Sequence, residues 1–404
     1  MTASSAAPVT RLAPARGAVT LMFLINGTVF GSWVSRIPDV SARLRLGEAL
    51  LGLALLGIAV GAIAAMPLVA PAVRRFGSRK VTTTAATAFC ASLPLLGLAP
   101  SLPALAGALI VFGAANGALD VSMNDNGSRV ERALGRPVMG TLHAAFSAGG
   151  AAGALAGGLA AGAGITSALH FTAAAVVLAV VAVLAGRCLA DLPDLRRGAH
   201  CVVAQHPRRA ARTAGVSRPL LLLLLVGLCA AFAEGAVADW STLYLVETLG
   251  SSTAFAAGGF VAFSALMVIG RLVQDPVVSR VGEAAVRRCG AALAAVGMTT
   301  ALLTTDPLVA VTGFAGGGVG LAAIFPLTMS GAGRLPGMAP ATAIAAVSAT
   351  AYGSLLAGPP LVGLLAHATS LNIALWSVTA ALMLVAALPS PTTTSPQRHT
   401  PPSR

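Results

Sequence analysis

Three carboxylic acids interrupt apolar stretches of this sequence, and they are its strongest candidates for chemistry. Asp120, Glu234 and Asp239 each lie well inside a run of residues that is otherwise almost free of charge. An ionised acid at the middle of a bilayer costs on the order of 2.5–3.5 kcal/mol, so such residues face a cavity, a partner or a proton pathway. We therefore expect Asp120 and Glu234, with Asp239 as a third candidate, to handle protons or the charge of a substrate.

Polar neighbours flank Asp120 by one helical turn on each side. Asn116 and Asn124 precede and follow it by four residues, so the three side chains share one helix face at steps of about 6 Å. We expect this face to point into the protein, where Asn116 and Asn124 bind substrate. Hydrogen bonding between helices is the alternative role. Asp125, the next residue, is expected at the membrane interface.

The two later acids cannot both face one small cavity. Asp239 follows Glu234 by five residues, which places it about 140° further around a helix. Glu234 is nearer the middle of its apolar stretch and is the stronger candidate. Asp239 adjoins Trp240 and Tyr244, and an aromatic belt at the membrane surface is the alternative interpretation of that group.

Four further polar or aromatic side chains are candidates for contact with a substrate. Asn26 and Trp33 are seven residues apart and so share a helix face, although Trp33 could instead anchor its helix at the interface. His143 lies three residues before Phe146, and a neutral histidine with a satisfied hydrogen bond is an equal alternative. Tyr352 completes the group.

Helices that cross a membrane must position these residues. The chain has 404 residues, of which 56% are hydrophobic and 10% charged, whereas soluble proteins carry about 25% charged residues. Twelve apolar stretches reach the roughly 20 residues needed to cross a bilayer, and they are too continuous for the strands of a β-barrel. We predict an all-α membrane protein. The expected spans are 18–36, 48–70, 81–100, 103–125, 138–163, 166–186, 219–245, 253–275, 289–305, 308–332, 342–366 and 371–390.

Basic residues are distributed unevenly among the connections, and this orients the spans. The chain carries 26 Lys and Arg against 13 Asp and Glu. We place only Arg36, Arg43 and Arg45 in loops on the outer side, and all other basic residues on the opposite side, as cytoplasmic loops require. This predicts a cell (inner) membrane protein with both termini in the cytoplasm. The positive charge therefore does not indicate nucleic-acid binding.

The sequence lacks the motifs of ATP-driven transport and of common enzymes. GxxxxGK[ST], HExxH, CxxC and GxSxG do not occur, so we expect no enzyme activity and no cofactor. The five cysteines show no metal-ligand spacing and none falls in an outer loop. We expect neither a bound metal nor a disulfide.

A basic connection at 187–218 divides the spans into two halves of six. It contains seven arginines and two prolines. We predict an N-terminal six-helix bundle over 1–186, a cytoplasmic linker over 187–218, a C-terminal six-helix bundle over 219–390 and a disordered tail over 391–404. This outline is typical of secondary transporters with repeated halves.

Similar motifs recur at matching places in the two halves. The loop after the second span reads RRFGSRK at 74–80, and the loop after the eighth reads DPVVSRVG at 275–282. The fifth span contains GALAGG and the eleventh GPP. With these motifs the chain resembles the major facilitator superfamily of transporters over all but its tails. The resemblance implies two bundles around a central site, with the two loops as cytoplasmic gates that contain Arg75, Gly77, Arg79, Arg280 and Gly282.

Two segments carry a narrower resemblance. NGALDVSMN at 116–124 is similar to the fourth span of the fucose-permease-like branch, and FAEGAVADW at 232–240 is similar to the seventh span of rhizopine-type, MosC-like membrane proteins. In sugar-transporting members of the first branch, a polar residue near the place of His143 contacts substrate. A second acid lies in their first span, where this chain has Gly31.

The resemblance implies a secondary active transporter that moves a small polar solute, with a sugar-like molecule as one candidate, by alternating access coupled to protons. We expect a monomer whose partners are this solute, H+ and membrane lipid. One alternative is a proton-antiporting exporter of drugs or metabolites, which a partial glycine motif in the fifth span favours. Another is a transporter-like sensor without net transport. Because Gly149, Gly153 and Gly157 recur every four residues, we interpret that motif mainly as close helix packing.

Overall fold

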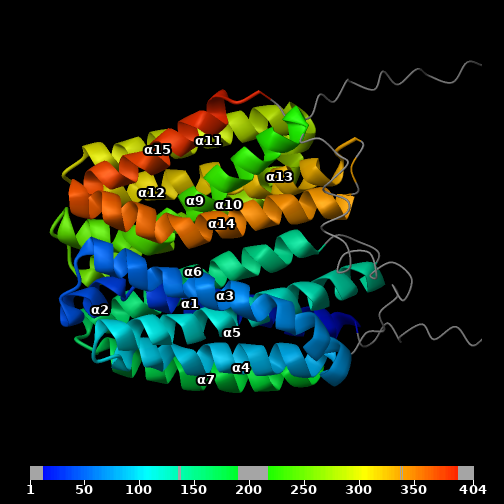
Figure 1. Cartoon of the computed structure of the whole chain (residues 1–404), viewed down its shortest axis with the longest axis horizontal. Coiled ribbons are helices and arrows are strands. Elements are labelled where there is room, and N and C mark those ends of the chain that lie inside the picture. Colours follow the sequence, from blue (N-terminus) through cyan, green and yellow to red (C-terminus); the bar gives the residue numbers. More distant parts are fainter. Residues whose placement is uncertain (1–11, 135–137, 190–216, 337, 339, 390–404) are drawn as a thin grey trace, which may run out of the picture.

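A computed structural model describes residues 12–134, 138–189, 217–336, 338 and 340–389 of the chain. All regular elements of this described part are helices, and they form two bundles that lie one against the other (Figure 1). The basic connection predicted at 187–218 and the tail predicted at 391–404 fall largely or wholly outside the described residues.

The N-terminal bundle begins with a long helix, α1, which is followed by a short helix, α2. Pro38 lies in the first turn of α2, and Arg45 ends this helix with a left-handed backbone. This corner replaces the simple loop expected after the first span. The helices of this bundle are α1 (Leu12–Val34), α2 (Ile37–Leu44), α3 (Glu48–Phe76), α4 (Ser78–Leu98), α5 (Leu102–Leu134), α6 (Met139–Gly162) and α7 (Ser167–Cys188).

The C-terminal bundle has the same number of crossings, but its fourth crossing is broken into two helices, α12 and α13. The break lies at Ala322 and Ala323. The helices of this bundle are α9 (Arg218–Glu247), α10 (Thr253–Val281), α11 (Glu283–Leu303), α12 (Pro307–Leu321), α13 (Ile324–Gly333), α14 (Pro340–Ala368) and α15 (Leu371–Ala387).

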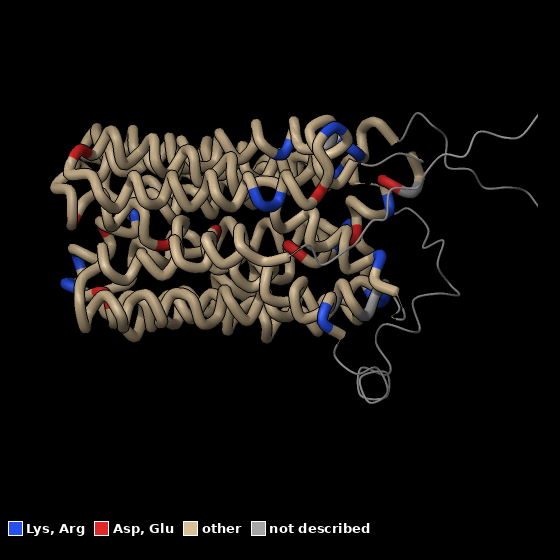
Figure 2. The backbone as a smooth tube through the Cα atoms, turned by 90° about the horizontal axis from the view of Figure 1, so that it is seen from above, with Lys and Arg blue, Asp and Glu red and all other residues tan. Residues whose placement is uncertain are grey.

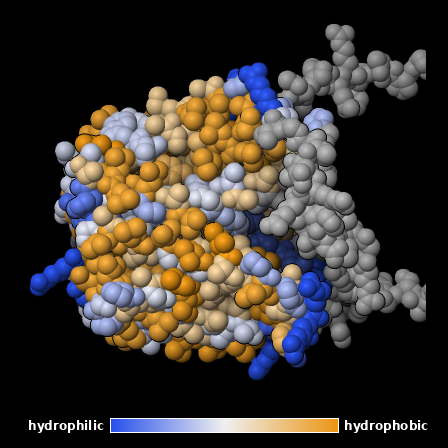
Figure 3. Space-filling view, in the orientation of Figure 1, coloured by the Kyte–Doolittle hydropathy of each residue, from blue (hydrophilic) through white to orange (hydrophobic). Residues whose placement is uncertain are grey.

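The helices have the length and composition of membrane spans. In the described part of the chain, eleven helical segments are long and apolar enough to cross a bilayer, with α12 and α13 counted as one segment, and α15 is a shorter apolar helix of 17 residues. The twelve predicted spans are thus confirmed, although α3, α5 and α10 continue past their predicted ends. Large apolar side chains such as Leu68, Leu159 and Leu303 are more than half exposed. Hydrophobic residues cover much of the face of the molecule seen in Figure 3, as lipid contact requires.

The helices run alternately between two ends of the molecule. We name these the linker end, where α7 stops and α9 starts, and the α2 end, where α2 lies. Most basic residues gather at the linker end (Figure 2). There α3 meets α4 at Gly77, and α10 meets α11 at Gly282, and both glycines have φ of 85°. A positive φ is readily adopted only by glycine. The two predicted gating loops therefore make the same kind of backbone turn, each at its own glycine.

Glycines bring helices into main-chain contact within each bundle. A Cβ atom on Gly27 or Gly31 of α1 would overlap main-chain atoms of α6, and one on Gly149 or Gly153 of α6 would overlap the main chain of α1. The interpretation of the fifth-span glycines as packing residues is therefore confirmed. In the C-terminal bundle, glycines of α11 and α12 meet in the same way.

Candidate functional site

A hydrogen bond between Tyr352 and Asp120 joins the two bundles. The Tyr352 hydroxyl on α14 donates to Oδ2 of Asp120 on α5 at 2.8 Å. The Asn124 amide, one turn further along α5, donates to Oδ1 of Asp120 at 3.0 Å and to its main-chain oxygen at 2.8 Å. Both carboxylate oxygens thus have a neutral donor, and neither has a cationic one among the described residues.

Asn26 of α1 donates from Nδ2 to Oδ1 of Asn116 at 3.1 Å. Asn116 stands one turn before Asp120 on the same face of α5. The structure therefore brings Asn26, Asn116, Asn124, Asp120 and Tyr352 into one polar group. The spacing along α5 predicts the shared face of Asn116, Asp120 and Asn124, and the contacts from α1 and α14 come from the structure.

Arg271 of α10 is a functional candidate that sequence reasoning missed. Its Nη1 donates to Ser147 Oγ at 2.6 Å and to the main-chain oxygen of His143 at 3.5 Å, both on α6 of the other bundle. Its Nη2 lies 3.4 Å from Oε1 of Glu234 on the adjacent helix α9. The Arg271 side chain is 12% exposed, whereas that of Glu234 is 36% exposed.

The placement of all but three basic residues in cytoplasmic loops is wrong for Arg271. The residue lies inside the span predicted at 253–275, so the signal was present in the sequence. A guanidinium at this depth requires polar partners, and Ser147, His143 and Glu234 supply them.

His143 contributes to this contact through its main chain. Its ring packs edge-on against Phe23 of α1, with the ring centroids 5.2 Å apart.

We name the polar group around Asp120, together with Arg271 and its partners, the polar layer. It consists of Asn26, Asn116, Asp120, Asn124, His143, Ser147, Glu234, Arg271 and Tyr352.

Trp33 lies apart from the polar layer. It is completely buried and packs against Phe171 of α7, with 6.3 Å between the ring centroids. The expected shared lining by Asn26 and Trp33 is not formed, because α1 turns this part of its surface toward α7. The interface-anchor alternative fails as well, since an anchor would be exposed to the headgroups.

Asp239 is also outside the polar layer, on the part of α9 nearer the α2 end. Its side chain is buried, and no hydrogen bond or ion pair to it is formed among the described residues. The aromatic-belt interpretation of its neighbours is wrong, because Trp240 and Tyr244 are completely buried. The Tyr244 hydroxyl instead donates to the main-chain oxygen of Ala301 and accepts from Asn372, within the C-terminal bundle.

The two gating loops lie at the linker end, away from the polar layer. Arg75 and Arg280 are exposed there, and the Arg75 guanidinium lies over the ring of Phe76 at 5.2 Å. Behind the first loop, Asp125 accepts from Ser78 at 3.4 Å and pairs with Arg129 at 2.8 Å. Arg79 also has interaction partners in this region.

The second loop has a comparable anchor. Glu283, directly after Gly282, receives both of its hydrogen bonds from Nη2 of Arg334 at 2.6 Å. The start of the helix after each gating loop is thus tied to a neighbouring element, by the hydrogen bond from Ser78 to Asp125 in the first half and by the ion pair of Glu283 with Arg334 in the second.

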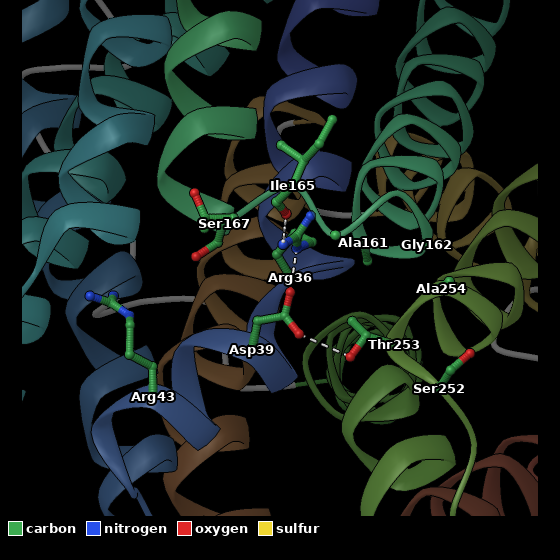
Figure 4. Close-up of a pocket in the computed structure, with 12 residues that line it drawn as sticks. Arg36, Asp39, Arg43, Ala161, Gly162, Ile165, Ser167, Ser252, Thr253 and Ala254 are labelled. Carbon is green, nitrogen blue, oxygen red and sulfur yellow. Dashed lines mark hydrogen bonds and ion pairs between the residues drawn. The ribbon is translucent and has the colours of Figure 1, made fainter.

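The α2 end is held closed by contacts between the bundles. A polar pocket of about 640 Å³ lies there, lined in part by Arg36, Asp39 and Thr253 (Figure 4). Oδ1 of Asp39 accepts from the Thr253 hydroxyl of α10 at 2.9 Å. Near it, the Thr242 hydroxyl of α9 donates to the main-chain oxygen of Val34 at 3.1 Å. Opening this end would break both hydrogen bonds.

Arg36 organises this closure from inside the N-terminal bundle. It is 3% exposed, pairs with Asp39, and donates to the main-chain oxygen of Ile165 at 2.7 Å (Figure 4). It also donates to the main-chain oxygen of Gly157 at 3.4 Å. Asp39 is thereby fixed in position to receive Thr253. Within the described residues, no cluster of His, Cys, Asp and Glu could hold a metal ion.

Comparison with known proteins places the chain in a family. The family described as Major Facilitator Superfamily matches residues 18–339. The chain is 36% identical to "Uncharacterized transporter y4wD" of Sinorhizobium fredii (strain NBRC 101917 / NGR234), over 93% of this chain and 97% of that protein. It is 32% identical to "Membrane protein MosC" of Rhizobium meliloti, over 91% and 88% of the two chains.

Solved structures show the same fold at low sequence identity. The nucleoside transporter NupG is similar with a TM-score of 0.66 at 11% identity, over 92% of this chain and 97% of that one. A D-xylose-proton symporter is similar with a TM-score of 0.71 at 15% identity, over 94% and 99%. The chain therefore belongs to the major facilitator superfamily and is a multi-pass membrane transporter.

Proposed function

We propose that this protein is a proton-coupled secondary transporter that carries a small polar solute across the cell membrane by alternating access. The observation that carries the proposal is the polar layer, in which Tyr352 meets Asp120 and Arg271 meets Ser147 across the bundle interface. Charged and polar groups inside membrane spans mark solute and proton pathways. Because the linker end holds most of the basic residues, we assign it to the cytoplasm.

The polar layer offers donors and acceptors suited to a hydroxylated solute. The amides of Asn26 and Asn116, and of Asn124, are the neutral groups that would contact it. Two proteins of similar fold are named for a nucleoside and for D-xylose with a proton, and solutes of this polar kind fit the layer. Trp33 and Asp239 lie outside it, so we leave them out of the proposed contact set.

Asp120 is the carboxylate that we assign to proton coupling. Its charge is stabilised only by neutral donors, from Tyr352 and Asn124. A hydrogen bond to a charged group contributes about 1.5–3 kcal/mol, against about 0.5–1.5 kcal/mol for a neutral one. A proton on Asp120 therefore weakens its bond to Tyr352 and loosens a bridge between the bundles. A proton on Glu234 would likewise release Arg271.

Alternating access then follows from the two ends of the molecule. The structure has its α2 end closed by Asp39, Thr253 and Thr242. A rocking motion would break these contacts and bring the gating loops of the linker end together. Arg75, Gly77, Arg79, Arg280 and Gly282 are the residues that we assign to that second gate.

Reconstitution into liposomes with an imposed pH gradient tests this proposal. Uptake of labelled D-xylose, nucleosides, polyols and sugar acids is measured with and without the gradient. Asp120→Asn and Glu234→Gln should abolish gradient-driven accumulation. Glu247→Gln, an exposed acid at the end of the same helix as Glu234, should not. Gradient-driven accumulation that survives both amide substitutions would disprove the proton roles.

A further inference from the structure

The Arg271 guanidinium has one edge that the protein leaves incompletely occupied. Its Nη1 is satisfied by α6, but its buried Nε has no acceptor among the described residues. Its Nη2 reaches only Glu234, at 3.4 Å, whereas charge-assisted N–H···O bonds are normally about 2.7–2.9 Å long. The edge formed by Nε and Nη2 thus carries one donor without a partner and one with a long contact.

This edge suits a carboxylate. A guanidinium can bind both oxygens of one carboxylate through two parallel N–H groups. Glu234 does not bind in this way, because only its Oε1 approaches and only Nη2 is contacted. Glu234 also remains 36% exposed, so space beside it is accessible. Its long contact with Arg271 is one that a better-placed carboxylate would replace.

We propose that the transported solute carries a carboxylate group, which Arg271 binds in place of Glu234. This inference rests on the proposed transport function and specifies its substrate class. The Asn26 and Asn116 amides would meet hydroxyl groups of the same molecule, so the class is a small hydroxylated carboxylate such as a sugar acid.

Displacement also explains how charge stays balanced in the polar layer. The carboxylate of the solute pairs with the Arg271 guanidinium in place of Glu234. The released Glu234 then takes up a proton from water on the entry side. The other titratable side chains of the layer are His143 on α6, Asp120 on α5 and Tyr352 on α14. The proton on Glu234 would thus enter together with the anion, in addition to the proton that we assign to Asp120.

Matched solute pairs test the charge requirement. The purified full-length protein is titrated with D-galacturonate and D-galactose, D-gluconate and D-sorbitol, and quinate and myo-inositol, and thermal unfolding reports binding. At least one carboxylate should raise the unfolding temperature, and its neutral partner should not. Equal stabilisation by the neutral partner, or no stabilisation by any of the three carboxylates, overturns the assignment.

Substitutions of Arg271 and Glu234 separate a role in solute binding from a structural role. Arg271→Gln should weaken carboxylate binding by at least about 30-fold, and Arg288→Gln, at an exposed site, should not change it. Glu234→Gln removes the competing carboxylate and should leave binding equal or tighter. The double variant Glu234→Gln/Arg271→Gln leaves no unpaired charge and should bind as weakly as Arg271→Gln, which controls for misfolding.

If Glu234→Gln weakens carboxylate binding as much as Arg271→Gln does, the pair is structural and the inference is wrong. These outcomes are separate from the test of the proposed function. Binding of a neutral solute alone would refute the anionic class and leave proton-coupled transport intact. The proposed function fails only if no solute, neutral or charged, accumulates with the pH gradient.

Discussion

The chain contains two tyrosines, and they offer a matched pair of substitutions. The hydroxyl of Tyr352 bonds to Asp120 in the opposite bundle, whereas that of Tyr244 bonds to Ala301 and Asn372 in its own bundle. Replacing either by Phe removes one oxygen atom. Tyr352→Phe should therefore shift the equilibrium between bridged and separated bundles. Tyr244→Phe should change only the stability of the C-terminal bundle.

The structure gives the expected size of the first effect. Removing the donor to a charged acceptor costs about 1.5–3 kcal/mol, and each 1.4 kcal/mol is tenfold in an equilibrium constant. Tyr352→Phe should shift the balance between bridged and separated bundles by roughly 10- to 150-fold. Asp120 keeps the bond from Asn124, so we expect the lower part of this range.

Electron spin resonance distances between the bundles can measure this shift. Asp120 and Tyr352 both lie closer to the linker end than to the α2 end of their helices, so their bond restrains the linker end. Spin labels at Lys80→Cys and Ser279→Cys, two exposed sites there, report its separation on a background without native cysteines. The widely separated population should rise in Tyr352→Phe and stay unchanged in Tyr244→Phe. Identical distance distributions in the two variants would refute the bridging role.

Two further comparisons test the packing of the bundles by scanning fluorimetry. Gly27→Ala presses a methyl group onto the main-chain oxygen of Phe146 and should lower stability by about 1–3 kcal/mol, whereas Gly17→Ala, with nothing within 4 Å, should be neutral or stabilising. Arg287→Gln removes one buried and one partly buried hydrogen bond to main-chain oxygens at the end of α15 and should cost about 1.5–3 kcal/mol for each bond. Arg288→Gln, at an exposed position, should not lower stability. Equal unfolding temperatures for the two glycine variants, or for the two arginine variants, would contradict the contacts described.

Hydropathy determines the span count of this chain almost completely, because lipid requires long apolar helices. Two features of the helices are not predicted by hydropathy, the corner between α1 and α2 and the break between α12 and α13. The α1–α2 corner depends on buried Arg36, whose main-chain acceptors lie more than 120 residues away. The break between α12 and α13 at Ala322 and Ala323 lies just before Pro326, which has no N–H to donate to the main-chain oxygen of Ala322 four residues earlier.

The polar layer was only partly predictable for a similar reason. The faces that carry Asn116 and Asp120 follow from helix periodicity, but the approach of Tyr352 is a contact between residues 232 positions apart. Trp33 has the right spacing from Asn26 and still points toward α7. Spacing shows which residues share a helix face but not which helix packs against that face. Arg271 was readable as a charge within a span, and only its partners required the structure.

A reversible cross-link at the α2 end tests alternating access most directly. Asp39→Cys and Thr253→Cys, placed where the two side chains now share a hydrogen bond, are joined by a short bifunctional thiol reagent that a reductant cleaves. Uptake into liposomes is then measured for the solute that most stabilises the protein. Uptake should stop when the two cysteines are joined and return on reduction. Full uptake with the α2 end locked shut would contradict alternating access.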